Sequence, residues 1–244
     1  MLKGIQTQAR AGTCIIPSSE SLADYDLGNV DCPKCHNMGV IVYTRDGIQY
    51  SRECECMAQR RSIRRIQKSG IADLLDRYTF DAYQDADQLR KQIKRKSKEF
   101  AEADYGWFLI AGQSGSGKTH ICTAICKRLM ERGNDVYYMS WRDESRRLKA
   151  LINSDEIDEQ MDRLKRVRVL YIDDFLKGGY SEADLRLAFE IINSRYNNRA
   201  LRTIISSELG LKDLFDIDEA MAGRIYERAR DYTISAPSEN WRLR

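Results

Sequence analysis

The stretch WFLIAGQSGSGKTH, residues 107–120, decides the fold class of this chain. Its first part, Trp107–Ala111, is an apolar run that predicts a buried strand, and Gly112–Thr119 then matches the pattern GxxxxGK[ST] in full. Residues 119–132 repeat apolar side chains at helical spacing. A strand, a glycine-rich loop and a helix in this order form the P-loop that binds nucleotide phosphates, so the sequence predicts an α/β nucleotide-binding fold.

The glycine-rich loop supplies the candidate nucleotide ligands. Its glycines let successive backbone N–H groups point at phosphates, and the N-terminus of the following helix adds positive partial charge. We expect Lys118 to reach the β- and γ-phosphates of ATP and the Thr119 hydroxyl to bind Mg²⁺. The predicted nucleotide-binding residues are Gly112, Gln113, Ser114, Gly115, Ser116, Gly117, Lys118, Thr119 and His120.

From about residue 71 onward, apolar runs alternate with helical patterns, which predicts a parallel sheet flanked by helices. The expected strands are Trp107–Ala111, Val136–Met139, Val167–Ile172, Thr203–Ser206 and Tyr232–Ser235. The expected helices are 86–104, 119–132, 143–152, 156–165, 181–197 and 217–230. The helix at 86–104 is strongly basic between Arg90 and Lys98, which suits either a solvated face or a contact with DNA.

Two acids follow the apolar run Val167–Ile172, at the place where a P-loop protein needs them. We expect Asp173 to hold the Mg²⁺ shell and Asp174 to polarise the attacking water. Because an aspartate is one methylene shorter than the more usual glutamate, hydrolysis is expected to be slow or to serve a switch. Ser206 ends the next strand and either senses the γ-phosphate or caps the strand.

Four cysteines crowd into residues 32–56, as Cys32-Pro-Lys-Cys35 and Cys54-Glu-Cys56. Between the pairs, an alternating stretch around Asp46-Gly47 is typical of a β-hairpin. Two cysteine pairs beside a hairpin suit tetrahedral Zn²⁺ and predict a small zinc-ribbon-like module. A redox-active CxxC is an alternative, and His36 is an alternative ligand to one of the sulfurs.

Composition excludes several protein classes. The chain has 244 residues, a net charge of +3 and 42% hydrophobic residues, which suits a folded protein that is not strongly basic overall. No apolar run reaches the roughly 20 residues that span a bilayer, and the N-terminus lacks the apolar core of a secretory signal. Seven cysteines, an odd number, argue against a disulfide framework. We therefore expect a cytoplasmic protein without a membrane partner.

The chain divides into two unlike segments near Ser69-Gly70. Residues 1–70 hold the cysteine cluster and end in a basic helical stretch at 60–68, whereas residues 71–244 hold the alternating strands and helices. We expect a small zinc-binding module followed by an ATPase domain.

The motifs GQSGSGKTH, VLYIDDF, TIISSE and AGRIYER, in this order behind CPKC and CEC, resemble bacterial and phage helicase loaders of the DnaC/DnaI type. These are AAA+ ATPases related to DnaA and to IstB. The resemblance covers about residues 78–244. It implies a P-loop AAA+ core with little or no lid domain, ATPase activity, and single-stranded DNA bound near the loop Lys177–Tyr180. It also implies that Arg224 is an arginine finger for a neighbouring subunit's ATP and that Arg242 contacts the nucleotide.

The resemblance leads to a functional expectation with ATP, Mg²⁺ and Zn²⁺ as cofactors. We expect an ATP-dependent loader of the hexameric replicative helicase of the DnaB type onto single-stranded DNA during the initiation of DNA replication. The zinc module would bind the helicase, and ATP would favour self-association of the AAA+ domains into a spiral or ring. The alternatives are an IstB-type transposase helper ATPase and a phage protein that sequesters the replication helicase or its loader.

Overall fold

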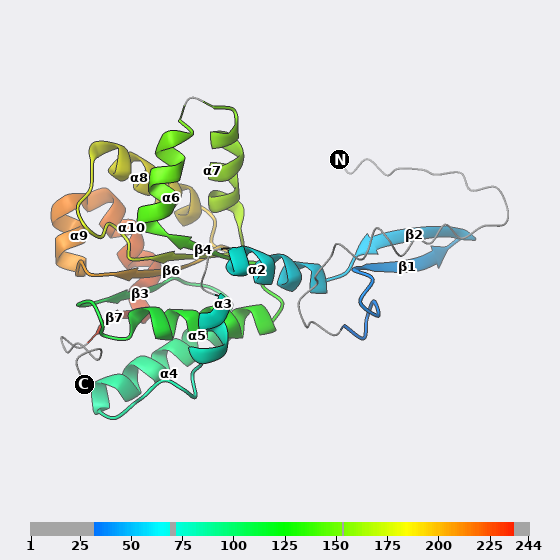
Figure 1. Ribbon diagram of the computed structural model, residues 1–244, viewed down its shortest axis with the longest axis horizontal. Coiled ribbons are helices and arrows are strands. Elements are labelled where there is room, and N and C mark those ends of the chain that lie inside the picture. Colours follow the sequence, from blue (N-terminus) through cyan, green and yellow to red (C-terminus); the bar gives the residue numbers. More distant parts are fainter. Residues whose placement is uncertain (1–31, 69–71, 153, 237–244) are drawn as a thin grey trace.

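Figure 1 shows the computed structural model of the chain, in which residues 32–68, 72–152 and 154–236 are described, with residues 65–68, 72 and 73 described by their backbone alone. The strands are β1 (Val40–Arg45), β2 (Ile48–Glu53), β3 (Phe108–Ala111), β4 (Val136–Ser140), β5 (Val169–Asp173), β6 (Arg202–Ser207) and β7 (Thr233–Ser235). The helices are α2 (Cys56–Lys68), α3 (Ala72–Arg77), α4 (Gln88–Glu102), α5 (Lys118–Glu131), α6 (Trp141–Ala150), α7 (Glu156–Arg166), α8 (Glu182–Tyr196), α9 (Leu211–Ile217) and α10 (Glu219–Ala229), and the 3-10 turn η1 spans Arg230–Tyr232.

Strands β3 to β7 form one parallel sheet in the order β4-β5-β6-β3-β7. Each apolar run that we expected to be a strand is one, with ends that differ by one or two residues. The order places β6 between β3, which leads into the P-loop, and β5, which carries the acids. Since the carboxyl ends of parallel strands meet at one edge of a sheet, the predicted site residues share that edge. The predicted α/β fold is confirmed.

Helices cover both faces of the sheet (Figure 1), with α4 and α5 on one side and α6 to α10 on the other. Side chains alternate along β3: Phe108 and Ile110 pack with α4 and α5, whereas Leu109 packs with the helices of the opposite layer. All residues of β3, β5 and β6 are buried, as expected for central strands of a sheet that is covered on both faces.

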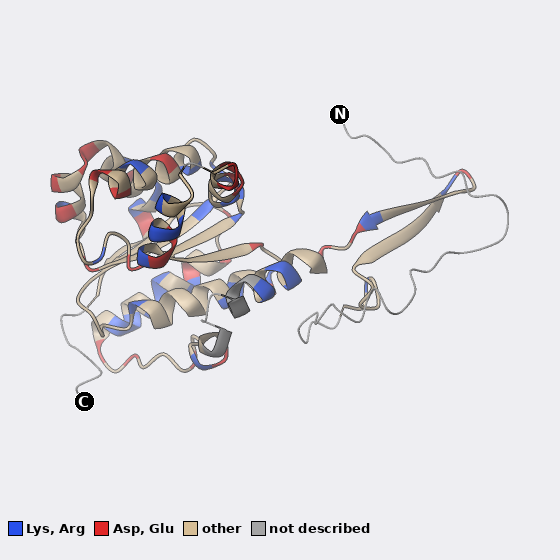
Figure 2. Cartoon of the chain, turned by 45° about the horizontal axis from the view of Figure 1, so that its top comes forward, with Lys and Arg blue, Asp and Glu red and all other residues tan. Residues whose placement is uncertain are grey.

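The antiparallel hairpin β1–β2 projects from this core and is joined to it by α2 (Figure 1). Charged side chains occur mainly near the ends of its strands, which are otherwise uncharged (Figure 2). The turn residues Asp46 and Gly47 have φ of +53° and +75°, which confirms the predicted hairpin turn. On α2, Ser62 Oγ accepts the backbone N–H of Val136 at 2.8 Å. The helix that follows the cysteine cluster therefore packs along the edge strand β4.

The expected helix 217–230 corresponds to α10, and the short helix α9 ends directly before it. Asp218 lies between them with an extended backbone, and its side chain accepts the N–H of Met221 at 2.8 Å. Aspartate at this place caps the N-terminus of the second helix, which explains why α9 ends before it. The short helices α3 and α9 were not expected.

Most of the cations in α4 are engaged within the molecule. Four of them contact an acid or a carbonyl: Arg90 with Asp87, Lys94 with Asp85, Arg95 with Glu99, and Lys96 with the backbone oxygen of Asp231. These contacts favour a solvated, internally paired face of α4 over a surface for DNA.

Some predictions fall outside the described residues, namely the join at Ser69-Gly70 and the nucleotide contact of Arg242. A lid domain would have to follow β7, where the description ends at residue 236. Within the described residues, no helix has the length and apolar character to cross a bilayer.

Candidate nucleotide and metal sites

The P-loop connects β3 to α5 through a backbone that depends on glycine. Gly115 and Gly117 have φ of +79° and +88°, a region that residues with a Cβ rarely adopt. At Gly112, a Cβ would lie 2.8 Å from the Cβ of Ala236, so the missing side chain lets the chain after β7 pack against the loop. The predicted phosphate loop is therefore formed in the expected strand–loop–helix context.

Lys118 is held inside the loop. Its side chain is 5% exposed, and Nζ donates to the backbone oxygens of Gly112 at 2.7 Å and Gln113 at 2.8 Å. Burial lowers the pKa of Lys118, while the nearby carboxylates of Asp174 and Glu208 act in the opposite direction. The ammonium thus lies between the loop and the acids at the ends of β5 and β6, where the phosphates of a nucleotide need a positive charge.

The two predicted Mg²⁺ ligands lie together. Thr119 Oγ1, in the first turn of α5, is 3.4 Å from Asp173 Oδ1 at the end of β5, and Asp173 is 7% exposed. Mg²⁺ prefers oxygen ligands and usually takes one or two carboxylates plus phosphate oxygens and waters. The donor set therefore fits the ion that the sequence predicted.

Asp174 has a side chain that is 36% exposed, and it is paired with a lysine. Its backbone has a φ of +53°, and its Oδ2 accepts from Lys177 Nζ at 3.0 Å. The same ammonium lies 2.9 Å from Oε1 of Glu208, which directly follows β6. Hydrogen bonds to Glu208 and Asp174 raise the pKa of Lys177 although burial alone would lower it.

The family resemblance implies that Lys177 lies in a loop near DNA, and no sequence motif singles out Glu208. The structure places both beside Asp174 and Lys118. Glu208 closely follows an apolar run, as Asp173 and Asp174 do, and that shared pattern is the signal that could have identified it.

Ser206 is fully buried behind the acids of β5. Its hydroxyl donates to Asp173 Oδ1 and accepts the backbone N–H of Asp174 at 3.0 Å. The side chain therefore connects β6 to both acids.

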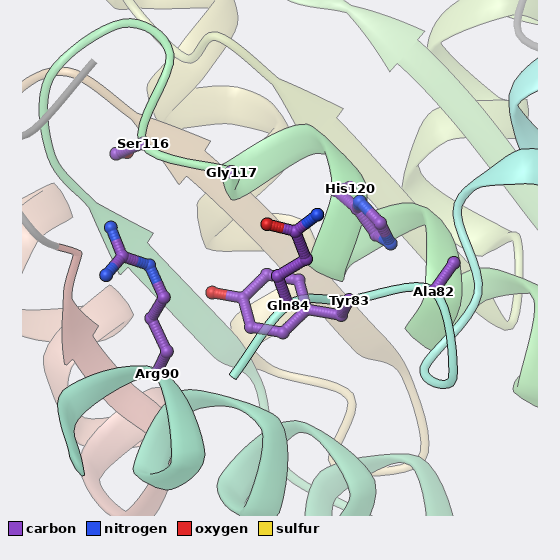
Figure 3. Close-up of a pocket in the computed structure, with 7 residues that line it drawn as sticks. All are labelled: Ala82, Tyr83, Gln84, Arg90, Ser116, Gly117 and His120. Carbon is purple, nitrogen blue, oxygen red and sulfur yellow. The ribbon is translucent and has the colours of Figure 1, made fainter. Parts of the chain in front are cut away.

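A pocket of about 300 Å³ lies against the P-loop (Figure 3). It is enclosed by Ser116 and Gly117 of the loop, by Arg90 of α4, and by Tyr83 and Gln84 of the segment before α4. The Ser116 hydroxyl is buried and has no hydrogen-bond partner among the described residues, so it is available to a ligand. No sequence motif marks residues 82–84, so the sequence predicts no role for them.

His120 anchors α5 to the same segment. Its ring stacks on Tyr78 with centroids 4.6 Å apart, and Nε2 lies 2.9 Å from the backbone oxygen of Thr79. Burial lowers the pKa of His120, which favours a neutral ring. His120 also lines the pocket, where its ring packs edge-on against that of Tyr83.

Arg224 lies on α10, and its side chain is directed at α8. Its guanidinium donates to the backbone oxygen of Ala220 at 2.7 Å and lies over the rings of Phe189 and Tyr196, at 5.2 and 5.7 Å. The side chain is thus folded against α8 in the single chain.

The structure brings the four predicted cysteine ligands together. The sulfur atoms of Cys32, Cys35, Cys54 and Cys56 all lie within 4.8 Å of one another. Two separations are 3.8 Å, between Cys32 and Cys54, and 3.6 Å, between Cys35 and Cys56. A tetrahedron with Zn–S bonds of about 2.3 Å has edges of about 3.8 Å, so the spacing suits Zn²⁺.

The cysteines of the cluster have different surroundings, which shift the pKa values of the Cys32 and Cys56 thiols in opposite directions. The backbone N–H of Cys35 lowers the pKa of the Cys32 thiol to about 7, whereas burial raises that of Cys56 to about 12. On the adjacent helix, Arg60 Nη2 donates to Asn37 Oδ1 at 3.0 Å and so ties α2 to the first cysteine loop. His36, the alternative ligand, is not among the residues that the structure groups with the sulfurs.

Two proteins of Bacillus subtilis resemble this chain closely enough to align over most of it. The YqaM protein is 30% identical over 80% of this chain and 66% of its own length. The XkdC protein of the phage-like element PBSX is 29% identical over 87% of this chain and 84% of its own length. The chain thus spans slightly less than two thirds of the first relative and more of the second.

More distant proteins have known roles or structures. The replicative helicase loader DnaC of Escherichia coli is 23% identical over 73% of this chain and 72% of its own length. A crystal structure of DnaI superposes with a TM-score of 0.58, 24% identity, and coverage of 68% of this chain and 93% of that one. AMPPCP-bound DnaA from Aquifex aeolicus gives a TM-score of 0.57 at 24% identity, over 67% of this chain and 51% of that one. These structures confirm the predicted AAA+ fold.

A family model assigns most of the chain. The model of the IstB-like ATP-binding protein matches residues 48–242, which include the P-loop, the acids after β5 and Arg224. The predicted kind of enzyme is confirmed with it: the chain belongs to the IstB-like ATP-binding protein family and is an AAA+ ATPase.

Proposed function

We propose that this chain is an ATP-dependent loader of a hexameric DnaB-type helicase onto single-stranded DNA, active in the initiation of DNA replication. One observation carries the proposal: the ATPase core is joined through α2 to a four-cysteine hairpin whose apolar side chains face solvent. An exposed apolar surface beyond the catalytic core suits a protein that must grip another protein. The similarity to the loader DnaC over 73% of this chain supports the same role.

The hairpin offers a surface for such a partner. Tyr43 and Tyr50 face each other across its strands with stacked rings 5.6 Å apart, and both are more than 40% exposed. Large exposed apolar side chains are concentrated here: Met38, Val40, Val42, Tyr43, Ile48 and Tyr50. A two-stranded sheet cannot bury both of its faces, and clustered apolar groups in water mark an interaction site. We propose that the helicase covers them.

Zn²⁺ would hold this module together. The hairpin has a small cluster of its own, in which Ile41 packs against the cysteines, and most of its other side chains are exposed. So small a core needs a covalent or metal link, and four cysteine sulfurs at tetrahedral spacing supply the ligands of a structural zinc site. We propose residues 1–70 as the zinc-binding module and 71–244 as the ATPase domain.

The residues around the P-loop would have different roles in ATP hydrolysis. Loop N–H groups and Lys118 would hold the phosphates, and the pocket beside Tyr83 would receive the base or the ribose. A bound Mg²⁺ would neutralise charge on the phosphates, held through Thr119 and Asp173. Asp174 would accept a proton from the water that attacks the γ-phosphate.

Assembly and DNA binding complete the proposal. In a side-by-side assembly, Arg224 would leave the rings of α8 and reach the γ-phosphate bound to the neighbouring subunit. The loop Lys177–Tyr180 would contact single-stranded DNA through the 44%-exposed ring of Tyr180, while Lys177 stays paired with Asp174 and Glu208 in the single chain.

A second candidate is a helper ATPase of a transposase. It is favoured by the family model itself and by the ATP-binding proteins of the insertion sequences IS232 and IS21, which are 23% and 24% identical over 56% of this chain. Both relatives align over a smaller share of the chain than the helicase loader DnaC does. The loader is therefore the first proposal.

The decisive experiment is a binding assay between the full-length chain and a DnaB-type helicase. Replacing Ile48, which is 57% exposed, by Glu should abolish binding, whereas the matched variant Leu89→Glu on α4, at 39% exposure, should bind like the parent. No binding of the parent to the helicase would refute the loader proposal. Binding to a transposase instead would support the helper ATPase.

A further inference from the structure

The carboxylate of Asp173 is surrounded by four neutral hydroxyl groups. Tyr171 donates to Oδ1 at 2.6 Å, Ser206 donates to the same oxygen, and Thr119 Oγ1 lies 3.4 Å from it. Tyr138 donates to Oδ2 at 3.2 Å. The metal-binding acid that the sequence predicted is thus enclosed by side chains from β4, β5, β6 and α5.

The two oxygens of this carboxylate have unequal surroundings. An ionised carboxylate offers about four acceptor positions, two on each oxygen. Oδ1 of Asp173 faces three hydroxyls and is filled, whereas Oδ2 accepts from Tyr138 alone among the described residues. Oδ2 therefore keeps an acceptor position for a further partner.

The two tyrosines reach Asp173 as a pair. Tyr138 and Tyr171 are direct cross-strand partners in the parallel pair β4–β5, and their rings pack edge-on with centroids 5.4 Å apart. Tyr171 precedes Asp173 by two residues on the same strand, so both side chains lie on one face of the sheet. The face is the one covered by α5, which carries the P-loop threonine. A phenylalanine ring would fill the same space at positions 138 and 171. The role of the two tyrosine hydroxyl groups is therefore their hydrogen bonds to Asp173.

We propose that Tyr171 and Tyr138 are positioning residues for the magnesium site, which fix Asp173 through Oδ1 and present Oδ2 to the hydrated ion. The inference rests on the proposed ATP site. Hydrogen bonds to a metal-binding carboxylate orient it, and losing such a partner typically lowers metal affinity by 10- to 100-fold. Without the Tyr171 hydroxyl, the carboxylate can rotate and no longer offers one defined oxygen.

The test separates nucleotide binding from the contribution of magnesium. A fluorescent, non-hydrolysable ATP analogue is titrated into the full-length chain in EDTA and again over a range of Mg²⁺ concentrations. For Tyr171→Phe, we expect unchanged affinity in EDTA and a half-saturating Mg²⁺ concentration raised roughly 10-fold. Tyr138→Phe should give a smaller rise, because its hydrogen bond is longer.

The matched control is Tyr196→Phe, which removes a tyrosine hydroxyl that donates to Glu227 Oε2 at 2.7 Å, between α8 and α10. It should leave both titrations unchanged. An unchanged Mg²⁺ midpoint in Tyr171→Phe would overturn the proposal, and so would an equal loss of affinity with and without Mg²⁺, since that marks a general structural defect.

A second variant keeps the proposal testable if Tyr171→Phe fails to fold. Ser206→Ala removes another donor to Oδ1, and the proposal requires it to raise the Mg²⁺ midpoint as well. If the parent chain itself gains no affinity from Mg²⁺, the proposed ATP site fails, and the positioning role fails with it. That result is seen in the parent and is distinct from a failure confined to the tyrosine variants.

Discussion

Lys177 holds Asp174: the ammonium nitrogen lies 3.0 Å from Oδ2 of the acid proposed to polarise the attacking water. A carboxylate that already accepts from a cation is a weaker acceptor for the proton of a water molecule. We therefore predict that Lys177→Ala raises the basal ATPase rate of the chain. An ion pair of this exposure is worth roughly 0.5–1 kcal/mol, which corresponds to about a 2- to 5-fold increase in kcat.

Steady-state ATPase assays at saturating ATP measure this effect, with Lys212→Ala on α9 as the control. Lys212 is exposed and has no ion pair with Asp174 or Glu208 among the described residues, so removing its ammonium group should leave the ATPase rate unchanged. A fall in rate for Lys177→Ala would show instead that the ammonium assists hydrolysis. Because Lys177 also pairs with Glu208, the variant Glu208→Gln tests whether the second acid shares the effect.

Lys118 is predicted to be essential to activity but not to folding. Lys118→Ala removes the proposed phosphate contact, and losing one such donor typically lowers kcat by about 100- to 1,000-fold. The same change removes a buried cation, which costs desolvation, so the midpoint of thermal unfolding should stay constant or rise. ATPase assays and thermal denaturation of the same preparation check both parts. A strong loss of stability would point to a structural role for its hydrogen bonds to the loop.

Local patterns in the sequence were sufficient to predict the sheet, the P-loop and the position of Asp173. Strands buried on both faces are continuous apolar runs, and the P-loop motif carries its own strand and helix. The cysteine pairs were equally local, because a hairpin of fixed register brings them together.

Contacts between distant segments could not be predicted in this way. The pairing of Tyr138 with Tyr171 depends on which strands are neighbours, and the pocket at Tyr83 forms because the segment before α4 folds over the P-loop. Helix α9 was missed for a different reason: it spans only seven residues, Leu211–Ile217, and the apolar spacing of so short a helix is a weak signal.

Zinc content is predicted to depend on the cysteine cluster alone. The parent chain should contain about one zinc per chain, and Cys54→Ser should contain far less, since a tetrahedral site needs all four ligands. Cys126→Ala is the control, because Cys126 is 1% exposed in the core on α5 and lies outside the cluster. Elemental analysis of the purified proteins measures the difference. Equal zinc in both variants would contradict the assignment of the cysteine site.

The lowered pKa of Asp184 should make the free energy of unfolding depend on pH. Burial alone would raise its pKa, but Lys149 at 2.7 Å and the hydroxyl and N–H of Ser181 outweigh this and lower the pKa to about 2. A lowered pKa in the folded state stabilises the protein above the unfolded value of 3.8, and this contribution is lost as the pH falls toward 2.

The variant Asp184→Asn should therefore lose about 2 kcal/mol of unfolding free energy at pH 7 and progressively less below pH 4. Urea denaturation at several pH values measures this, provided that the parent remains folded across the range. The exposed Asp158→Asn on α7 is the control and should behave like the parent at every pH. A deficit that stays constant between pH 7 and pH 3 would mean that the carboxylate contributes by packing rather than by charge.

The last prediction concerns the junction between α2 and the sheet. Ser62 is fully buried, and its hydroxyl accepts the N–H of Val136 at 2.8 Å and lies 3.0 Å from Asp135 Oδ1. Ser62→Ala leaves a buried N–H on the edge strand β4 without a partner, which costs about 1–3 kcal/mol. We expect a lower urea midpoint together with faster protease cleavage near α2, because the helix loses its attachment to the core. Ser51→Ala, on the exposed strand β2, should change neither. If Ser62→Ala cost no more than Ser51→Ala, the hydroxyl would not be what holds α2, and with it the cysteine hairpin, against the ATPase core.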